Sequence, residues 1–442
     1  MKKVTCWAML LSLLGGFSLS AHALSEEEIL KRLEAYEERI KALEEELKDS
    51  QKQSKKAVSR VKSLGKQVQT DKERIRFSGF LSAGATVSNI DEANYLDTIE
   101  GNRVNTQKDS IVGIQTDYKI SDRSKAVVQL VARGEERDWN INAEWAFIDY
   151  EFTENFTMRA GRMRNPRYMV SEYLEVGYSY LWIRPPEEVY NLVSTNSFDG
   201  FMALYNPSCS SWDFNFQAYW GRNVNDRDDA EGDFDLNLND TMGVTALGYW
   251  RNWTFRTGYS RADLDLELPT VAFLGSTPGT VTGGSFTNLS NLLAARGEAD
   301  NFTFNNADAE FMSVGFQYDN GSFVAISEAI KLRVAGYLSD GESHYLTVGY
   351  RIGPVTPYAT YARYRTIDDG LRAGSSVASV LESTFNEKQK RYSLGLRYDF
   401  APGLAAKVEV STIDDLEGTR GLFDSANAEE GEIFSIVIDS VF

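Results

Sequence analysis

The hydrophobic pattern of the chain changes from a helical to a strand-like period near residue 75. Before that point, apolar residues recur at alternating spacings of four and three from Ile29 to Leu47, and the same register continues to Val68. Such a seam is typical of a coiled coil. After residue 75, apolar and polar residues alternate, as they do in strands with one apolar face. The sequence therefore predicts an α-helical coiled coil over 24–74 and an all-β domain over 75–442.

Sixteen segments of the second part have strand-like alternation, and each has roughly the ten residues that a tilted membrane strand needs. In one of them Trp212, Phe214 and Phe216 alternate with polar neighbours. The predicted strands lie near 75–87, 110–120, 125–133, 142–152, 156–163, 198–206, 211–220, 240–250, 253–266, 310–319, 323–333, 344–352, 355–365, 390–400, 404–412 and 432–442.

Long and short connections alternate between these strands. The short ones include Arg251-Asn252, Asn320-Gly321 and Gly353-Pro354, whereas the long ones run to dozens of residues, as over 164–197 and 267–309. Short periplasmic turns and long extracellular loops are typical of a transmembrane barrel. An open sheet edge would leave backbone groups unpaired in hydrocarbon, so the strands must close. We predict a 16-stranded antiparallel transmembrane β-barrel, which is wide enough for a water channel.

The first 23 residues have the pattern of a secretory signal peptide. Lys2 and Lys3 precede an apolar stretch from Val4 to Leu19, and Ala21-His22-Ala23 is a small-x-small cleavage site. A membrane anchor is the alternative, but no longer apolar run follows. Cleavage would leave Cys209 as the only cysteine and His344 as the only histidine.

These residue counts argue against catalysis. One cysteine and one histidine cannot form a disulfide or a Cys/His metal cluster. Ser343 and His344 are adjacent on a predicted strand, so their side chains should point to opposite faces rather than meet as nucleophile and base. The net charge of −18 argues against a nucleic-acid binder. We expect no enzyme activity, no cofactor and no metal.

Residues 39–44 of the coiled coil form a six-residue pattern that favours a bundle of three helices. Arg39 and Glu44 flank the core residues Ile40 and Leu43, in positions where charge pairs between helices select the partner and the register. We expect a homotrimer, assembled in part through these four residues.

The last residues alternate Phe434, Ile436 and Ile438 and end in Phe442, which resembles the strand signal that the outer-membrane assembly machinery reads. Ser440 departs from the bulky residue usual at its place. With the leader, the coil and the strand count, the chain resembles trimeric Gram-negative outer-membrane porins with a periplasmic N-terminal coiled coil, the DcaP-like group. Segments such as 159–166 and Phe198-Asp199-Gly200 are similar to strand and turn pieces of such porins.

In that family the third extracellular loop folds into the barrel and narrows the pore, and here it would be the connection over 164–197. Arginine suits a pore because its planar fork holds carboxylates and stays charged at any pH. The resemblance implies a constriction of Arg159, Arg164, Arg167 and Arg184, facing Glu172, Glu175 and Glu187, with Arg133, Arg256, Arg333 and Arg397 along the wall.

Passive diffusion of small hydrophilic solutes, with a preference for carboxylates, is the leading hypothesis. The acidic net charge favours cations instead, although much of the acid lies in predicted loops such as 221–239, where it could bind divalent cations that bridge lipopolysaccharide. The alternative is an envelope tether whose coil links the outer membrane to a periplasmic component, with peptidoglycan as a candidate partner. An outer-membrane hydrolase is disfavoured by the strand count and the single histidine.

Overall fold

The structure is a computed structural model that describes residues 56, 74–90, 94–96, 99, 101–135, 139–193, 197–224, 235–267, 304–334, 340–367, 387–416, 419, 421–423 and 430–442. The chain divides into two units, Met1–Lys72 and Glu73–Phe442, and almost all of the described residues belong to the second. The predicted signal peptide lies outside the described residues, as do Arg39, Ile40, Leu43 and Glu44 of the predicted coil.

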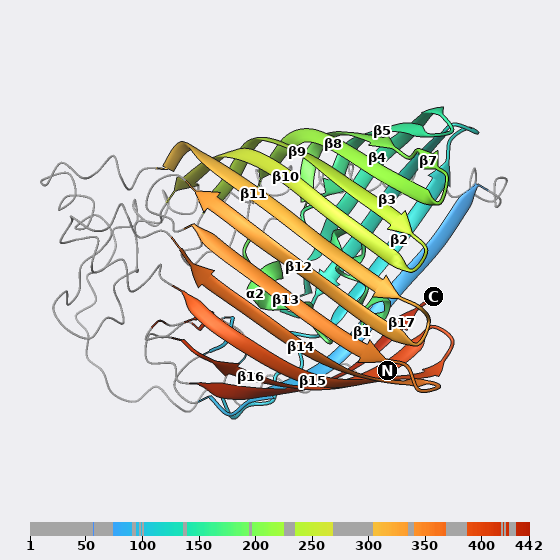
Figure 1. Cartoon of the computed structure of the whole chain (residues 1–442). Coiled ribbons are helices and arrows are strands. Elements are labelled where there is room, and N and C mark those ends of the chain that lie inside the picture. The colour runs from blue at the N-terminus through green and yellow to red at the C-terminus, as the bar shows by residue number, and fades with distance from the viewer. Residues whose placement is uncertain are drawn as a thin grey trace, which may run out of the picture. The chain divides into compact units, whose positions relative to one another are not determined.

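The second unit is a closed antiparallel β-sheet (Figure 1). The first strand pairs with the second strand on one side and with the last strand on the other, so the ring has no free edge. The strands are β1 Ile75–Ser88, β2 Ile111–Lys119, β3 Ser124–Arg133, β4 Ile141–Thr153, β5 Phe156–Arg164, β6 Ser197–Tyr205, β7 Ser208–Cys209, β8 Trp212–Val224, β9 Asp235–Trp250, β10 Trp253–Glu267, β11 Phe304–Asp319, β12 Phe323–Val334, β13 Gly341–Tyr350, β14 Val355–Thr366, β15 Lys388–Ala401, β16 Leu404–Asp414 and β17 Gly431–Val441.

Sixteen of these strands are long, and they confirm the predicted 16-stranded antiparallel barrel. The seventeenth, β7, is a two-residue piece within the predicted turn after β6, where Ser208 pairs with Asp213 and Cys209 with Trp212. Three strands extend well past their predicted ends on the long-loop side: β8 continues to Val224, β9 begins at Asp235 and β11 begins at Phe304.

The strands have one face turned outward and one turned into the barrel. On β13, Leu346 and Val348 are exposed on the outer face, whereas Tyr345 and Thr347 are buried inside. The predicted separation of Ser343 from His344 is confirmed, because Ser343 is buried and His344 is exposed. No helix among the described residues is long and apolar enough to cross a membrane.

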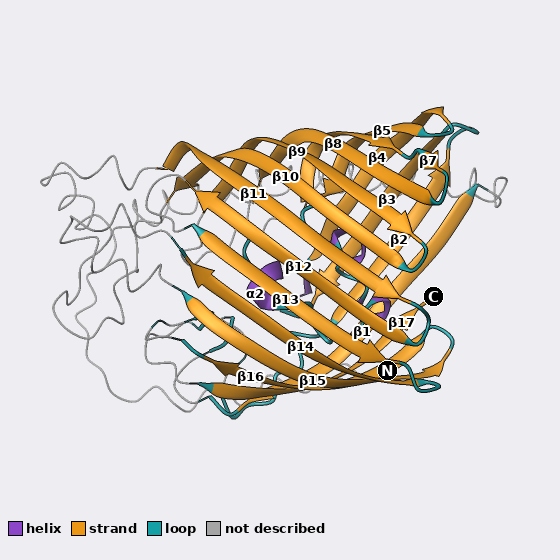
Figure 2. Ribbon diagram, viewed as in Figure 1, coloured by secondary structure: helices purple, strands orange, loops and turns teal. Residues whose placement is uncertain are grey.

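The connection between β5 and β6 lies inside the ring of strands, and we call its described residues 165–193 the inner loop. It contains three short helices, η2 Ser171–Tyr173, η3 Gly177–Ser179 and α2 Glu187–Tyr190, drawn in purple in Figure 2. The helix α2 lies against β13, β14 and β15, and η3 lies against β1 and β17. Trp182, Val189 and Tyr190 pack there with Tyr345 and Tyr358 of the wall, so the loop has its own apolar core.

Candidate functional site: the inner loop and the facing wall

Cationic side chains of the barrel wall hold the backbone of the inner loop. Lys407 on β16 donates to the carbonyls of Gly177 and Trp182 at 2.6 and 2.7 Å. Arg397 on β15 donates to the carbonyls of Tyr178 and Tyr180 at 2.7 and 2.8 Å. A buried carbonyl without a donor is costly, so these bonds stabilise the irregular loop in a place where strand pairing cannot.

The start of the loop is fastened in the same way. Arg256 on β10 donates to the carbonyl of Pro166, and Glu328 on β12 accepts from the backbone N–H of Met169 at 3.0 Å. Arg256 and Glu328 are themselves 3.6 Å apart as a buried ion pair. The predicted wall residues Arg256 and Arg397 therefore face inward and contact the loop.

A first ion-pair cluster joins the inner loop to β3, β4 and the end of β5. Glu175 of the loop is 2.7 Å from Arg133 and 2.8 Å from Arg164, and Arg133 is also 2.6 Å from Glu144 on β4. We call these four residues the Arg164 cluster. Burial alone would raise the pKa of Glu175, but the charges of Arg133 and Arg164 outweigh burial and bring the pKa to about 2.

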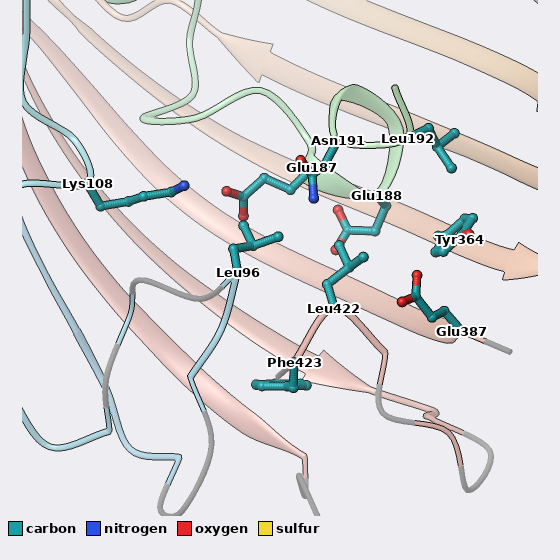
Figure 3. Close-up of a pocket in the computed structure, with 10 residues that line it drawn as sticks. All are labelled: Leu96, Lys108, Glu187, Glu188, Asn191, Leu192, Tyr364, Glu387, Leu422 and Phe423. Atoms are coloured by element: carbon teal, nitrogen blue, oxygen red, sulfur yellow. The ribbon is translucent and has the colours of Figure 1, made fainter. Parts of the chain in front are cut away.

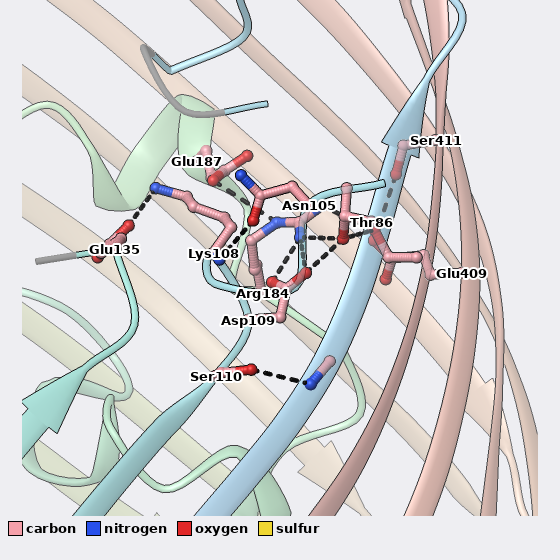
Figure 4. Close-up of polar contacts among 12 residues, drawn as sticks. Thr86, Asn105, Lys108, Asp109, Ser110, Glu135, Arg184, Glu187, Glu409 and Ser411 are labelled. Carbon is pink, nitrogen blue, oxygen red and sulfur yellow. Dashed lines mark hydrogen bonds and ion pairs between the residues drawn. The ribbon is translucent and has the colours of Figure 1, made fainter. Parts of the chain in front are cut away.

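A second cluster surrounds the other loop arginine. Arg184 donates to Asp109 at 2.5 and 2.6 Å, and its Nε lies 3.7 Å from Glu187 (Figure 4). Arg391 on β15 reaches Glu187 and Glu188 at 3.3 and 3.2 Å. We call these five residues the Arg184 cluster.

The pKa values of Arg184 and Glu187 in this cluster are both raised, but for different reasons. For Arg184, burial lowers the pKa but the neighbouring Asp109 and Glu187 carboxylates more than offset it, so the pKa is raised. For Glu187, burial is the largest effect and raises the pKa although Arg184 and Arg391 lower it. The carboxyl of Glu187 therefore takes up a proton at a higher pH than an exposed glutamate does.

A cavity of about 230 Å³ lies between the inner loop and the wall formed by β1 to β3. Both clusters contribute to it, through Arg133 and Glu175 on one side and Arg184 and Glu187 on the other. Lys108 also lines this cavity and is 2.6 Å from Glu135.

A second cavity, of about 300 Å³, lies on the long-loop side and shares Lys108, Glu187 and Asn191 with the first. Its other lining residues include Glu188, Tyr364, Leu422 and Phe423, shown in Figure 3. The shared residues place the two cavities next to each other on one side of the inner loop.

A third cavity, also of about 300 Å³, lies at the short-turn end and is lined by residues of β1 to β4 such as Arg76, Asp117, Lys125 and Asp149. The first and third cavities thus border β1 to β4, whereas the second lies between α2, Tyr364 of β14 and the long connections. The backbone of the loop is held by side chains of β10, β12, β15 and β16, and its charged residues Glu175 and Arg184 pair with Arg133 on β3 and with Asp109. We call the space along the inner face of β1 to β4 the lane.

The remaining predicted site residues lie apart from these clusters. Arg159 faces inward nearer the short-turn end of β5 and pairs with Asp149 at 2.7 Å. Glu172 is exposed and accepts a hydrogen bond from Gln217 at 3.2 Å. Arg167 is buried in the inner loop, and its carbonyl accepts from Ser313.

Arg333 lies on the outer face of β12, 3.7 Å from Glu310. The alternation of the strand explains this position, since Glu328 points inward to the loop and Arg333 is an odd number of residues away. Arg333 therefore points away from the lumen, contrary to its expected place on the pore wall.

Several residues of the site carry no signal in the sequence that marks them. Asp109 closes the Arg184 cluster from a long connection, and Lys407, Asp439 and Glu328 sit singly on otherwise ordinary strands. A charged residue at an inward position of a strand is the one pattern that could have found the last three. Among the described residues, no group of three or more His, Cys, Asp or Glu side chains is placed to hold a metal ion.

Comparison with solved structures places this geometry among porin barrels. The chain is similar to OmpF of Salmonella typhi in complex with daunomycin, with a TM-score of 0.53 and 14% identity over 83% of this chain and 97% of that one. It is similar to an anion-selective porin from Comamonas acidovorans, with a TM-score of 0.52 and 12% identity over 83% and 99%. The chain has the porin fold.

The outer membrane channel DcaP of Acinetobacter baumannii is also similar, with a TM-score of 0.50 and 12% identity over 83% of this chain and 97% of that one. No protein-family model matches the sequence. No curated protein matches it either. At these identities the likeness concerns the barrel fold and does not extend to the charges that line the lane.

Proposed function

We propose that this protein is an outer-membrane porin through which small hydrophilic solutes diffuse passively along the lane. The observation that carries the proposal is a closed barrel in which two cavities with charged lining residues lie beside β1 to β4, one of them against the inner loop. An outward apolar face and a ring without edges are what a lipid bilayer requires.

The narrowest part of the lane is proposed to lie between the Arg164 and Arg184 clusters. Most of their charges are paired within each cluster, so the field across the lane is weaker than separate rows of Arg and Glu would produce. A preference for carboxylates would come from Lys108, Arg133 and Arg184, whose donors border the cavity.

We further propose that the protein is a homotrimer in the outer membrane. The support is the coil hexad with Arg39, Ile40, Leu43 and Glu44, and the proposed location of the coil is the periplasm. Recognition by the outer-membrane assembly machinery would use β17 and Phe442.

Single-channel recording of the purified protein in a planar bilayer tests the function. We expect closure in three current steps, with a reversal potential in a salt gradient that reports the sign of the preferred ion. Block by succinate, but not by a neutral sugar of similar size, would support the preference for carboxylates. An absence of conductance in a folded, heat-resistant barrel would contradict the porin proposal and favour the envelope tether.

A further inference from the structure

Three residues line both the first and the second cavity and so form the passage between them: Lys108, Glu187 and Asn191. We call these three residues the neck. Figure 3 shows the ammonium of Lys108 and the carboxylate of Glu187 turned toward each other, with Asn191 next to Glu187. The neck therefore offers a positive charge, a negative charge and an amide at one place.

The two charges of the neck form their ion pairs with other residues. The ammonium of Lys108 donates to Glu135 at 2.6 Å, and a lysine ammonium has two further donors. One carboxylate oxygen of Glu187 accepts from Arg391 at 3.3 Å, whereas the other lies 3.7 Å from Nε of Arg184, beyond hydrogen-bond distance. Both side chains thus keep hydrogen-bonding capacity toward the space between them.

The second cavity also has an apolar wall. We give this name to the four apolar residues of the long connections and the inner loop that line it: Leu96, Leu192, Leu422 and Phe423. The backbone N–H of Leu96 donates to the carbonyl of Leu422 at 3.0 Å, and the N–H of Leu422 donates to the side chain of Gln389 on β15 at 2.9 Å. These bonds hold the wall in place before a solute arrives, which lowers the entropic cost of binding.

Few kinds of solute match the neck and the apolar wall together. A simple cation would be attracted by Glu187 and repelled by Lys108, and a simple anion would meet the reverse. A neutral sugar would pair with neither charge and would bring hydroxyl groups against the apolar wall, where they find no partner. A molecule that has an ammonium group, a carboxylate and an apolar body is complementary to all three features.

We propose that the neck and the apolar wall bind an amino acid with an apolar side chain. Glu187 accepts from the ammonium of the amino acid, Lys108 and the amide of Asn191 donate to its carboxylate, and its side chain lies on the apolar wall. The second cavity, at about 300 Å³, is of a size that suits a small ligand. The inference rests on the proposed function, because it names a class of solute for the same channel.

The test is the block of single-channel current through the full-length protein in potassium chloride by four matched solutes. Leucine carries all three features, leucinamide lacks the carboxylate, 4-methylpentanoate lacks the ammonium and glycine lacks the apolar side chain. We expect leucine to give half-maximal block at a concentration about tenfold lower than any of the other three, since each of them loses one favourable contact.

Two variants separate the contributions of the neck and of the wall. We expect K108Q to weaken the block by leucine about tenfold and to leave the block by leucinamide unchanged, because leucinamide has no carboxylate. L192S should bring leucine towards glycine. The matched control is K390Q, which removes a lysine that also pairs with an acid, Asp415, but lies on the outer face of β15.

Equal block by leucine and its three analogues in a conducting channel would overturn the inference and leave the porin proposal in place. An equal loss of leucine and leucinamide block in K108Q would also overturn it, because the lysine would then act on the fold and not on a carboxylate. If the protein does not conduct, the porin proposal fails. Calorimetric titration of leucine into the detergent-solubilised protein then decides: binding that is weakened in K108Q supports the site, and an absence of binding overturns it.

Discussion

Arg184 is the residue whose loss should change the lane most. It holds Asp109, whose side chain is only 2% exposed, and its own charge borders the cavity beside Lys108. When one partner of a buried ion pair is removed, the other remains as an uncompensated charge.

We expect R184M to be less stable by about 3–5 kcal/mol. The unpaired Asp109 should also shift the reversal potential towards cations. The control is R184M/D109L, which removes both charges and should recover most of the stability. Urea unfolding and salt-gradient recordings check the two effects, and an unchanged reversal potential in R184M would place Arg184 outside the ion path.

A second prediction at this scale concerns pH. Burial raises the pKa of Glu187, so this carboxyl should become neutral at a higher pH than an exposed glutamate. As the pH falls through this raised pKa, we expect the ion selectivity to shift towards anions. The variant E187Q should show a smaller pH-dependent shift, and an E187Q response equal to that of the wild type would contradict the assignment.

The pKa of Glu175 is shifted in the opposite direction to that of Glu187. Its pKa is about 2, below the ordinary value of 4.5, because Arg133 and Arg164 favour the charged form over the effect of burial. A depressed pKa in the folded state contributes stability that is complete above the ordinary value and is lost as the pH falls through about 2. We expect the difference in unfolding free energy between the wild type and E175Q to be constant above the ordinary value and to shrink only below it.

Residue type alone identified the charged residues of the site but not their partners. Of the residues predicted for the constriction, Arg184, Glu175 and Glu187 line one cavity, and Arg164 lies 2.8 Å from Glu175. The sequence could not show that each would pair within a cluster, because Asp109 is 75 positions from Arg184 and Arg391 is 204 positions from Glu187. Arg333 was placed on the wrong face because strand alternation was not applied to it.

At the scale of elements, the inner loop depends on the wall more than on its own secondary structure. Its three helices are only three or four residues long, and such short helices are marginal by themselves. Backbone bonds to Lys407, Arg397 and Arg256 replace the regular hydrogen bonding that the loop lacks. Loss of one of these cations should therefore loosen the loop locally.

We expect K407M to increase the open-channel noise and the mean conductance, because Gly177 and Trp182 lose their donor. The same change leaves Asp439, 2.8 Å from Lys407, buried without a cation. The control K407M/D439L removes both charges and should restore stability but not the loop contacts. If both variants had the open-channel noise and the conductance of the wild type, the apolar contacts of the loop alone would be enough to hold it in place.

The strands themselves could be predicted because a lipid environment requires an apolar residue at every second position of a strand. The predicted β12, β14 and β10 agree with the structure to within one residue at each end. The ladders of β8, β9 and β11 continue beyond the alternating apolar zone, as in the pair Asn223 and Leu238. Outside hydrocarbon both faces can be polar, so the hydrophobic pattern ends before the hydrogen bonding does.

At the scale of the whole molecule, we expect the coil to determine the number of chains in the assembly. The heptad register and the hexad with Arg39 and Glu44 predict a trimer, and both lie in the part of the chain before the barrel. We expect deletion of residues 25–70, with the leader retained, to yield barrels that conduct but form fewer heat-resistant trimers. Gel mobility without boiling measures this, and trimers of undiminished heat resistance would show that the coil does not clamp the assembly.

The contacts of the inner loop also imply an order of events during folding. The loop precedes β6, yet Lys407, which holds it at η3, and Asp439, which pairs with Lys407, come from β16 and β17 at the other end of the chain. Contacts between such distant positions form late, since the whole intervening chain must be ordered first. The constriction would therefore take its final shape only when the last strand joins the first, so that a partly folded barrel passes through a stage with a wider lumen than the finished one.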